Sequence, residues 1–508
     1  MIGGDKEMKY ISTRGYEKKY SASEAIVLGI APDGGLFVPE SIPTLSADDI
    51  EEMKNMAFYQ ISARVLSKFL DEFSEKELLE YTSQAYHEDK WGENTVPLVQ
   101  LNAYNDREFI LELWHGPTAA FKDVALQLLP HLMTASIKKT GESKKICILT
   151  ATSGDTGKAA LEGFKDLPGT EIIVFYPSDG VSEAQKLQMI TTTGSNTHVI
   201  AVNGCFDDAQ TGVKNIFADQ AFNDKLNSNG VKLSSANSIN WGRLVPQIAY
   251  YVYSYIELLR TEKIEKGESI NIVVPTGNFG NILAAWYAKQ MGIPVHRLIC
   301  ASNRNKVLCD FFSSGKYDRN REFFKTTSPS MDILISSNLE RLLFELTDKN
   351  AEQVKEWMKE LNTNGVYSVD AKTLKKLQML FVGGFADETG VSKTILDVYD
   401  RTDNVIDTHT AVGFNIYNRY HQRSSDEAKT VFASTASPFK FSPAVMDALR
   451  GNGYSNGRSV ETIIKELSEE SGLEIPAGIK DLSSKEILHK DMIEKDQMEN
   501  KVEEILIG

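Results

Sequence analysis

Cysteine is scarce in this sequence, at four of 508 residues. No two cysteines form a C-x-x-C pair, which argues against a disulfide framework and against a zinc knuckle. Apolar runs are far shorter than the ~20 residues that a membrane-spanning helix needs. The N-terminal residues are polar and lack the hydrophobic stretch of a signal peptide. We therefore expect a cytoplasmic protein without a membrane partner.

Concentrated positive charge is also missing. The chain holds 55 Lys and Arg against 70 Asp and Glu, a formal net charge of −15. Because so acidic a protein repels a phosphate backbone, we expect no nucleic-acid partner. The eight histidines include no pair four residues apart, and no Asp, Glu or Cys cluster has metal spacing, so we assign no metal. The remaining composition, 42% hydrophobic and 25% charged, is typical of a globular enzyme with a large core.

The spacing of apolar residues divides the chain into three parts. Over residues 1–95, apolar residues at helical spacing predict an N-terminal helical domain. From 96 to 440, short apolar strands alternate with helices, which indicates an α/β fold with parallel sheets covered by helices. Residues 441–508 are charged and predict a solvated C-terminal helical segment. The expected strands include 144–151, 171–176, 270–275 and 295–301, and the expected helices include 158–166 and 282–291.

A glycine-rich loop, Gly-Asn-Phe-Gly-Asn at 277–281, separates an expected strand from an expected helix. Free N–H groups at a helix N-terminus bind anions, and glycines allow close approach. A tight turn without a ligand fits the same pattern. A dinucleotide fits less well, because the next strand ends in Ala-Ser-Asn-Arg-Asn and supplies no carboxylate for a ribose. A phosphate monoester is the better ligand, and a nicotinamide-dependent oxidoreductase is disfavoured.

Two other segments combine anion-binding groups. Residues 152–157, Thr-Ser-Gly-Asp-Thr-Gly, add three hydroxyls to the backbone donors, which suits a carboxylate or a phosphate; helix caps are the alternative. Ser238, Asn240 and Arg243 can converge on one anion, with the guanidinium forking to two phosphate oxygens. A surface salt bridge is the alternative for Arg243. Residues 434–438, Ser-Thr-Ala-Ser-Pro, fit a loop when taken alone.

Lys122 begins an expected helix, after the segment His115–Phe121. The positive end of the helix dipole and the apolar neighbours Phe121 and Val124 should lower its pKa from the ordinary ~10.4. A lysine of that kind forms Schiff bases. An exposed first-turn lysine is the alternative, and the spacing alone favours it. Two phosphate-type loops, one carboxylate-type loop and one activated lysine together fit pyridoxal phosphate and a phosphorylated amino acid.

At these motifs the sequence resembles the threonine synthases, pyridoxal-phosphate enzymes of fold type II (the tryptophan-synthase-β-like group), and in particular their longer subgroup with an added N-terminal domain. The matching segments are 10–15 (YISTRG), 33–40 (DGGLFVPE), 115–123 (HGPTAAFKD), 152–157 (TSGDTG), 238–243 (SINWGR), 277–281 (GNFGN), 407–413 (DTHTAVG) and 434–438 (STASP). The resemblance implies two open, mostly parallel sheets flanked by helices, the smaller subdomain covering about 122–235. It also implies conversion of O-phospho-L-homoserine and water to L-threonine and phosphate, the last step of threonine biosynthesis.

Site roles follow from the same resemblance. Lys122 would be the catalytic lysine and would carry the cofactor. The cofactor phosphate would be bound by Gly277, Asn278, Phe279, Gly280 and Asn281. Thr435 would face the pyridine nitrogen, and Asp155 the cofactor's ring oxygen. The substrate would be bound by Ser153 and Thr156 at its carboxylate and by Ser238, Asn240 and Arg243 at its phosphate. The sequence departs from the pattern at Thr408, often Pro, at Ser437, His in some members, and at Asp155, where many fold-type-II relatives carry Asn.

Other functions stay open from the sequence. A serine/threonine dehydratase would use the same fold on a related amino acid. A non-catalytic relative would keep the fold as a ligand-binding module, although the intact Lys122 and loops favour an enzyme. The sequence does not distinguish a monomer from a homodimer.

Overall fold

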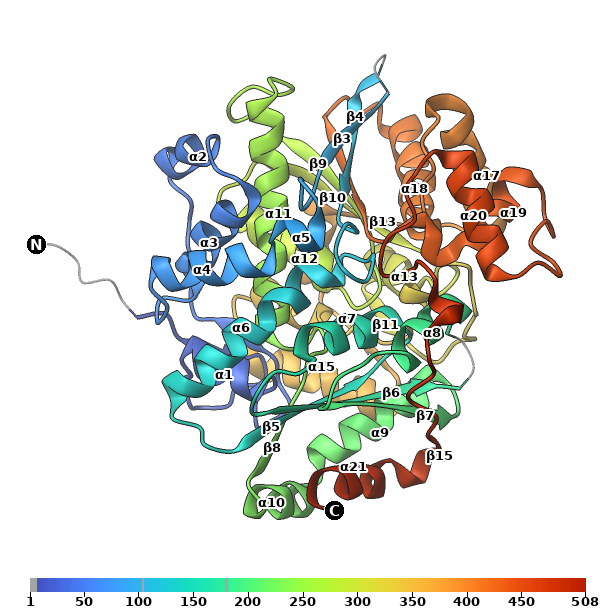
Figure 1. Ribbon diagram of the computed structural model, residues 1–508. Coiled ribbons are helices and arrows are strands. Elements are labelled where there is room, and N and C mark those ends of the chain that lie inside the picture. Colours follow the sequence, from blue (N-terminus) through green and yellow to red (C-terminus); the bar gives the residue numbers. More distant parts are fainter. Residues whose placement is uncertain (1–6, 103–104, 179–180) are drawn as a thin grey trace, which may run out of the picture.

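Two mostly parallel β-sheets form the framework of the molecule in a computed structural model, which describes residues 7–102, 105–178 and 181–508 (Figure 1). The larger sheet has the strand order β13-β10-β9-β14-β4-β3, and its one antiparallel pair within these residues is β3–β4. The smaller has the order β15-β7-β6-β5-β8 with parallel pairing throughout. The predicted α/β fold with two open sheets is confirmed.

Most strands of the two sheets correspond to apolar runs of the sequence. The larger sheet contains β3 (Leu98–Asn102), β4 (Asn105–Glu112), β9 (Ile270–Pro275), β10 (Val295–Ser302), β13 (Phe381–Phe385) and β14 (Thr430–Ser434). The smaller contains β5 (Lys145–Ala151), β6 (Thr170–Pro177), β7 (Thr197–Asn203), β8 (Val231–Ser234) and β15 (Met492–Glu494). Two short antiparallel pairs stand apart from them: β1 (Tyr10–Ser12) with β2 (Phe37–Pro39), and β11 (Lys316–Asp318) with β12 (Val366–Ser368).

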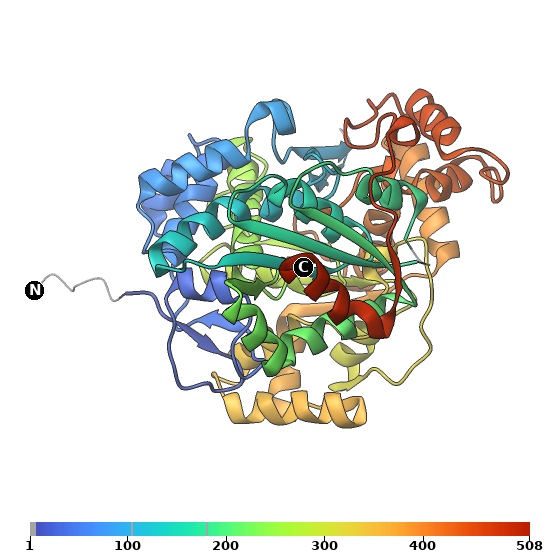
Figure 2. The same ribbon diagram turned by 60° about the horizontal axis from the view of Figure 1, so that its bottom comes forward.

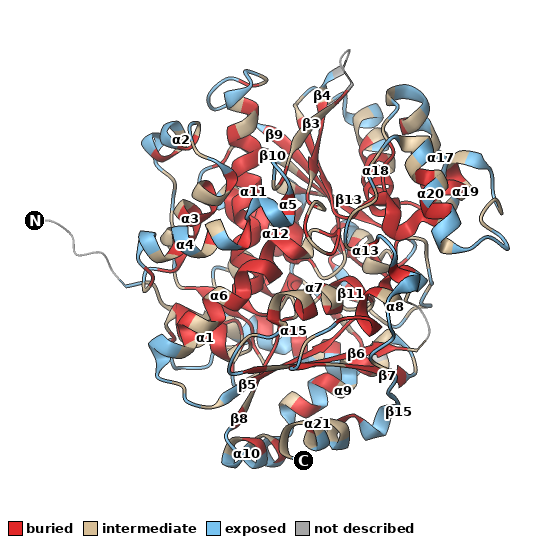
Figure 3. Cartoon of the chain, in the orientation of Figure 1, coloured by how far each residue is buried: buried red, intermediate tan, exposed pale blue. Residues whose placement is uncertain are grey.

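Helices cover the sheets and fill the space between them (Figures 1 and 3). In the N-terminal part they are α1 (Ala22–Leu28), α2 (Ala47–Met53), α3 (Phe58–Phe69), α4 (Glu75–Ala85) and α5 (Glu88–Trp91). The middle of the chain forms α6 (Lys122–Thr140), α7 (Asp155–Phe164), α8 (Glu183–Ile190), α9 (Phe206–Ala218), α10 (Gln220–Ser228), α11 (Trp241–Arg260), α12 (Gly280–Gln290) and α13 (Val307–Ser314). The remainder forms α14 (Leu339–Leu346), α15 (Ala351–Asn364), α16 (Ala371–Leu380), α17 (Glu388–Thr402), α18 (Thr408–Ser424), α19 (Ser442–Arg450), α20 (Val460–Ser471) and α21 (Met498–Ile507), with short 3₁₀ turns η1 (Pro329–Met331) and η2 (Pro438–Phe441).

The N-terminal part shares its core with the rest of the molecule. The predicted helices between Ser46 and Tyr86 are present, but the chain before them adds the β1–β2 pair, which helical spacing did not predict. The Tyr10 hydroxyl donates to the Phe69 carbonyl at 2.8 Å, and the Tyr10 ring lies 5.4 Å from that of Trp241 at the start of α11. The N-terminal segment therefore supports a helix of the central layer.

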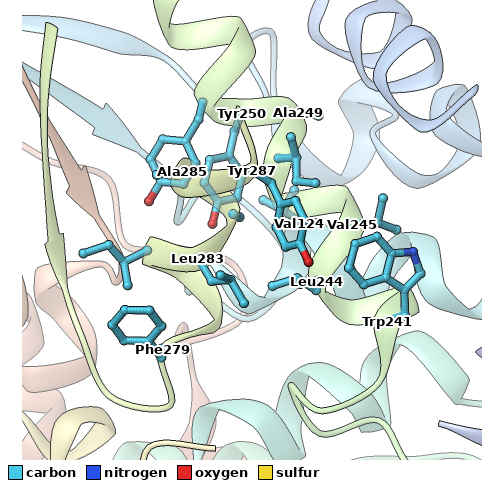
Figure 4. Packing of buried hydrophobic residues seen from close by; sticks show 14 of the residues in the cluster. Val124, Trp241, Leu244, Val245, Ala249, Tyr250, Phe279, Leu283, Ala285 and Tyr287 are labelled. Atoms are coloured by element: carbon cyan, nitrogen blue, oxygen red, sulfur yellow. The ribbon is translucent and has the colours of Figure 1, made fainter. Parts of the chain in front are cut away.

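Helices α11 and α12 are buried on nearly all sides and pack against each other (Figure 4). Trp241, Leu244 and Val245 of α11 pack in the same cluster as Leu283 and Tyr287 of α12. The rings of Trp241 and Tyr287 meet edge to face at 5.5 Å. Because both helices begin at predicted binding loops, this packing fixes the position of those loops.

The C-terminal segment differs from the expected solvated helical segment. Its residues 492–494 form strand β15, which pairs in parallel with β7. Helix α21 follows at the end of the chain (red in Figure 2). Its residues Met498 and Val502 are buried. A three-residue strand among charged neighbours carries no periodic signal, which explains why the sequence did not predict it. Within the described ranges, no helix has the length and apolar character needed to cross a membrane.

The close approach of α6 and α7 depends on a glycine. Pro130 lies inside α6 and has no N–H, so the carbonyl of Leu126 lacks its usual helical donor. A Cβ added to Gly163 of α7 would lie 2.1 Å from that carbonyl oxygen. The glycine therefore allows the two helices to approach.

We expect Gly163→Ala to destabilise the protein by about 1–3 kcal/mol, because backbone atoms must move apart. Gly390→Ala is the matched control, because its added Cβ meets side chains and no backbone: Asn415 Nδ2 at 3.2 Å and Asp387 Oδ1 at 3.3 Å. Denaturant unfolding measures both. Equal midpoints for the two variants would contradict this account of the contact.

Candidate active site

The segments predicted to bind ligands follow the carboxyl ends of strands from both sheets. They are 115–123 after β4, 152–157 after β5, 238–243 after β8, 277–281 after β9 and 434–438 after β14. Ligands of open α/β sheets bind outside these strand ends, where consecutive loops diverge. Side chains far apart in the sequence meet there.

Lys122 is the first residue of α6, as predicted, and its side chain is 12% exposed. The preceding loop folds back on the helix, because Asp123 accepts hydrogen bonds from Thr118 N at 2.8 Å and Thr118 Oγ1 at 2.7 Å. Burial lowers the pKa of Lys122, an effect that Asp155 opposes and that Arg243 reinforces. The predicted direction of this pKa shift is confirmed, with burial as its main cause.

Asp155, the first residue of α7, is the buried carboxylate of the site. Its Oδ2 lies 3.6 Å from Lys122 Nζ and accepts a hydrogen bond from Ser330 Oγ at 2.8 Å. Its Oδ1 lies 2.8 Å from Lys440 Nζ and accepts from Gln185 Nε2 at 2.7 Å. Burial raises the pKa of Asp155, but the two ammonium groups and these hydrogen bonds hold it well below the ordinary value. Asp155 is therefore ionised.

Lys440 and Ser330 are site residues that the sequence analysis missed. Lys440 follows the 434–438 motif within Pro-Phe-Lys-Phe, and a lysine between two aromatic residues in an apolar turn is a recognisable signal of burial. Ser330 lies in an irregular segment, and its sequence neighbours give no comparable signal.

His409 is a buried histidine at the start of α18 that contacts the same cluster. Its Nε2 accepts a hydrogen bond from Ser330 N at 3.2 Å, so the ring proton belongs on Nδ1, which donates to Asp407 Oδ1 at 2.9 Å. Next to it, Thr408 Oγ1 donates to the Thr327 carbonyl at 2.7 Å. The start of α18 thus anchors η1 against Asp155. Of the three departures from the family pattern, Asp155 is the buried carboxylate described above, Thr408 serves this anchor, and Ser437 caps η2.

The loop 277–281 has the form of an anion site. No acceptor for its backbone N–H groups is present among the described residues, and Phe279 has a positive φ of 64° where the loop enters α12. A Cβ at Gly277 would lie 2.7 Å from the Ser330 carbonyl oxygen, which places η1 against the loop. Asn281 Oδ1 accepts from Tyr251 at 2.6 Å, and its Nδ2 is buried without a partner in the described chain.

The segment 238–243 brings one cation, Arg243, into the site. Arg243 is buried, its Nε has no hydrogen-bond partner in the described chain, and burial lowers its pKa to about 10. Ser238 Oγ accepts from Asn338 Nδ2 at 3.1 Å. The Asn240 side chain donates to the carbonyls of Ile26 and Ser235 and accepts from Gly242 N, so in this structure it acts as a helix cap.

Three hydroxyls that were predicted to bind ligands have no hydrogen-bond partner in the described part of the protein. Ser153, Thr156 and Thr435 make no side-chain hydrogen bond within the described residues, although Thr435 is only 6% exposed. The carbonyl of Thr435 accepts from Phe121 N at 2.8 Å, which joins its loop to the lysine segment. His115, in contrast, is paired with Glu112 at 2.7 Å and stacked on Trp114.

Family models match three consecutive parts of the chain. Residues 9–86 match the family model "Threonine synthase N terminus", residues 92–388 match "Pyridoxal-phosphate dependent enzyme", and residues 410–504 match "Threonine synthase, C-terminal". The chain belongs to the threonine synthase family. Its central region belongs to the pyridoxal-phosphate-dependent enzymes, and its fold is fold type II, as the resemblance implied.

Individual relatives support the family. The threonine synthase of Pseudomonas aeruginosa is 39% identical over 445 residues, which cover 87% of this chain and 90% of the relative. Threonine synthase-like 1 of Homo sapiens is 37% identical over 97% of this chain, but the chain spans only 66% of that relative. Among solved structures, pyridoxal-phosphate-bound threonine synthase from Brucella melitensis superposes with a TM-score of 0.84 at 34% identity, covering 99% of this chain and 100% of that one. Yeast threonine synthase gives 0.85 at 34% identity, with 98% and 99% covered.

The residues present fit the cofactor of this family. The loop 277–281 offers free N–H groups to a phosphate, Lys122 offers a buried amine, and the free hydroxyl of Thr435 fits a ring nitrogen.

Arg341 of α14 supports these loops from behind. It is fully buried, and its guanidinium donates to the carbonyls of Phe37 at 2.9 Å, Ile239 at 2.6 Å and Ser238 at 3.4 Å, and to Asn338 Oδ1. The Asn338 backbone and side chain also bind the carbonyl of Asn278, at 3.1 and 3.0 Å. One side chain thus connects the N-terminal β2 with the predicted substrate loop.

We expect Arg341→Met to cost at least about 3 kcal/mol of unfolding free energy, because several buried carbonyls lose their donors. Arg458→Met is the matched control: this arginine pairs with Glu466 at the surface, and its removal should change stability by less than about 0.5 kcal/mol. Urea unfolding compares the two. A loss for Arg341→Met as small as that of the control would refute the supporting role.

Proposed function

We propose that this chain is a threonine synthase, which converts O-phospho-L-homoserine and water to L-threonine and phosphate as the last step of threonine biosynthesis. The observation that carries the proposal is one buried cluster of charges: Lys122, 3.6 Å from Asp155, with Arg243 close enough to lower the lysine pKa. Ser330 of η1 donates a hydrogen bond to Asp155, and η1 also lies against the loop 277–281.

The residues that would hold the cofactor are Lys122 at its aldehyde, Gly277, Asn278, Phe279, Gly280 and Asn281 at its phosphate, Thr435 at its ring nitrogen and Asp155 near its ring oxygen. When bound, pyridoxal phosphate supplies an electron sink that stabilises negative charge on substrate carbons. A neutral hydroxyl at the ring nitrogen does not enforce a protonated ring, so more of the chemistry falls to Lys122.

Lys122 is the proton carrier of the proposed reaction. Its lowered pKa leaves more of the amine neutral near neutral pH, which is what a base requires. We assign to Lys122 Nζ the removal of protons from the α- and β-carbons of the substrate and their return, one at the γ-carbon and one at the α-carbon. Phosphate leaves from the γ-carbon, the hydroxyl of water adds at the β-carbon, and the remaining proton of that water leaves with the phosphate.

Arg243 sets the substrate specificity in this proposal, together with Ser238 and Asn240, while Ser153 and Thr156 would bind the substrate carboxylate. A buried guanidinium with a free Nε is stabilised by a phosphate and left unpaired by unphosphorylated homoserine. Phosphate recognition would therefore decide which amino acid reacts.

We further propose a cytoplasmic enzyme with a small-molecule substrate as its partner, in keeping with four free cysteines. Sedimentation would tell a monomer from a homodimer.

Lys122→Ala should abolish the visible absorbance of bound pyridoxal phosphate and reduce threonine formation by at least about 10²–10⁴-fold, since the attachment point and the base are lost together. Absorbance titration with the cofactor and a threonine assay measure the two effects. Lys359→Ala, at a lysine 73% exposed in its side chain, is the control that should change neither. A retained band in Lys122→Ala would assign the cofactor to another lysine.

Arg243→Ala should raise KM for O-phospho-L-homoserine by up to about a thousandfold, with cofactor absorbance nearly unchanged. Steady-state kinetics and spectra of the same preparation separate substrate binding from cofactor binding. An unchanged KM would remove Arg243 from the phosphate site.

The test of the activity itself is incubation with O-phospho-L-homoserine while phosphate and threonine are followed together. Equal amounts of both products support a threonine synthase. Phosphate without threonine would indicate a related lyase, and a chain that binds no pyridoxal phosphate would indicate a non-catalytic relative.

A further inference from the structure

Lys440 is a fully buried lysine to which the proposed reaction assigns no role. Its side chain has 0% exposure, and its ammonium has three acceptors: Asp155 Oδ1 at 2.8 Å, the Thr118 carbonyl at 2.9 Å and Gln188 Oε1 at 3.2 Å. An ammonium has three N–H donors, so all of them are used. A buried cation this well satisfied is a fixed charge of the site.

The three acceptors come from different parts of the fold. Asp155 begins α7, Gln188 lies on α8, and Thr118 lies in the loop that leads to Lys122 and also holds Asp123. Lys440 itself lies in η2, just after the loop of Thr435. Its contacts therefore connect the segment of the proposed catalytic lysine with the smaller sheet and its helices.

The two lysines are not equivalent partners of Asp155. Lys440 Nζ lies at 2.8 Å from one carboxylate oxygen, whereas Lys122 Nζ lies at 3.6 Å from the other, outside hydrogen-bond distance. Gln185 and Ser330 occupy further positions around the carboxylate. The Asp155 carboxylate therefore faces two lysine side chains, and the closer one, Lys440, compensates its negative charge.

We propose that Lys440 is a positioning residue that acts through Asp155: it supplies the permanent counterion of that carboxylate and so leaves Lys122 free to exist as a neutral amine. The inference rests on the proposed function in one respect, that Lys122 is the reactive amine. A site with Asp155 and Lys122 alone would hold the lysine as the ammonium half of a salt bridge, which neither attacks an aldehyde nor takes a proton.

The charges that face Lys122 are Asp155 from α7, Arg243 from α11 and Lys440 from η2. Lys440 in turn faces Asp155 and Asp123, the buried acid of the first turn of α6. Removing Lys440 takes one positive charge away from the surroundings of Lys122. It also leaves Lys122 as the only lysine paired with Asp155 among the described residues. Both changes favour the charged form of Lys122, so its neutral form should require a higher pH.

The experiment measures the Lys122 amine directly, in the chain without added cofactor. The full-length protein reacts with acetic anhydride across a range of pH, and mass spectrometry gives the pH at which Lys122 becomes half-reactive. Lys440→Met should raise this midpoint by at least about one pH unit. At any pH below the wild-type midpoint, the fraction of Lys122 in the neutral form should then fall about tenfold. Asp155→Asn should lower it, and the double variant should return toward the wild type.

The double variant distinguishes this route from a general loss of structure, since a merely structural defect would persist when Asp155 is also changed. Lys359→Met, at an exposed lysine, is the matched control and should leave the midpoint unchanged. Lys440→Gln keeps a donor for Thr118 without the charge; it should show the same rise and serves if Lys440→Met does not fold, as judged by near-UV circular dichroism.

Two results would overturn the inference: an unchanged midpoint in the Lys440 variants, or a rise that remains in the double variant. Formation of the visible band on addition of pyridoxal phosphate gives a second readout and should show the same shift in pH. A wild-type chain that binds no pyridoxal phosphate would instead refute the proposed function, while the labelling midpoints would still be measurable.

Discussion

A single carboxylate, that of Asp155, organises the site, because a buried charge must be paired and hydrogen-bonded. Its partners Lys122, Lys440, Gln185 and Ser330 come from α6, η2, α8 and η1. These four elements are therefore held around the Asp155 carboxylate, where their side chains pair with it or donate hydrogen bonds to it. The same requirement explains why η1 is held on its other side by His409.

Local patterns in the sequence predicted much of the fold and the location of the site. Strands of the sheets are short apolar runs, and the loops 152–157 and 277–281 lie between strands and helices as expected, because strand, turn and helix propensities depend on neighbouring residues. Lys122 was predicted at a helix N-terminus for the same reason. The roles of these positions come from the resemblance to the threonine synthases and stay predictions.

Contacts over long sequence separations could not be predicted in this way. Ser330 and Asp155 are 175 residues apart, and nothing near Ser330 indicates that its hydroxyl will reach a carboxylate. Asn240 shows a different limit: asparagine suits both a phosphate site and a helix cap, and the structure gives its amide three protein partners. The boundaries placed at 95 and 440 stay predictions, while Arg341 ties the first part of the chain to the site through Phe37.

Strand β15 has a consequence for how the protein forms during synthesis. Asn203 on β7 bonds to Glu494 on β15, across 291 residues. Until the ribosome has made those late residues, one edge of the smaller sheet exposes unpaired backbone groups, the usual starting point for association between chains. Nascent molecules therefore pass through a period in which this edge needs shielding, and closing so large a loop is intrinsically slow.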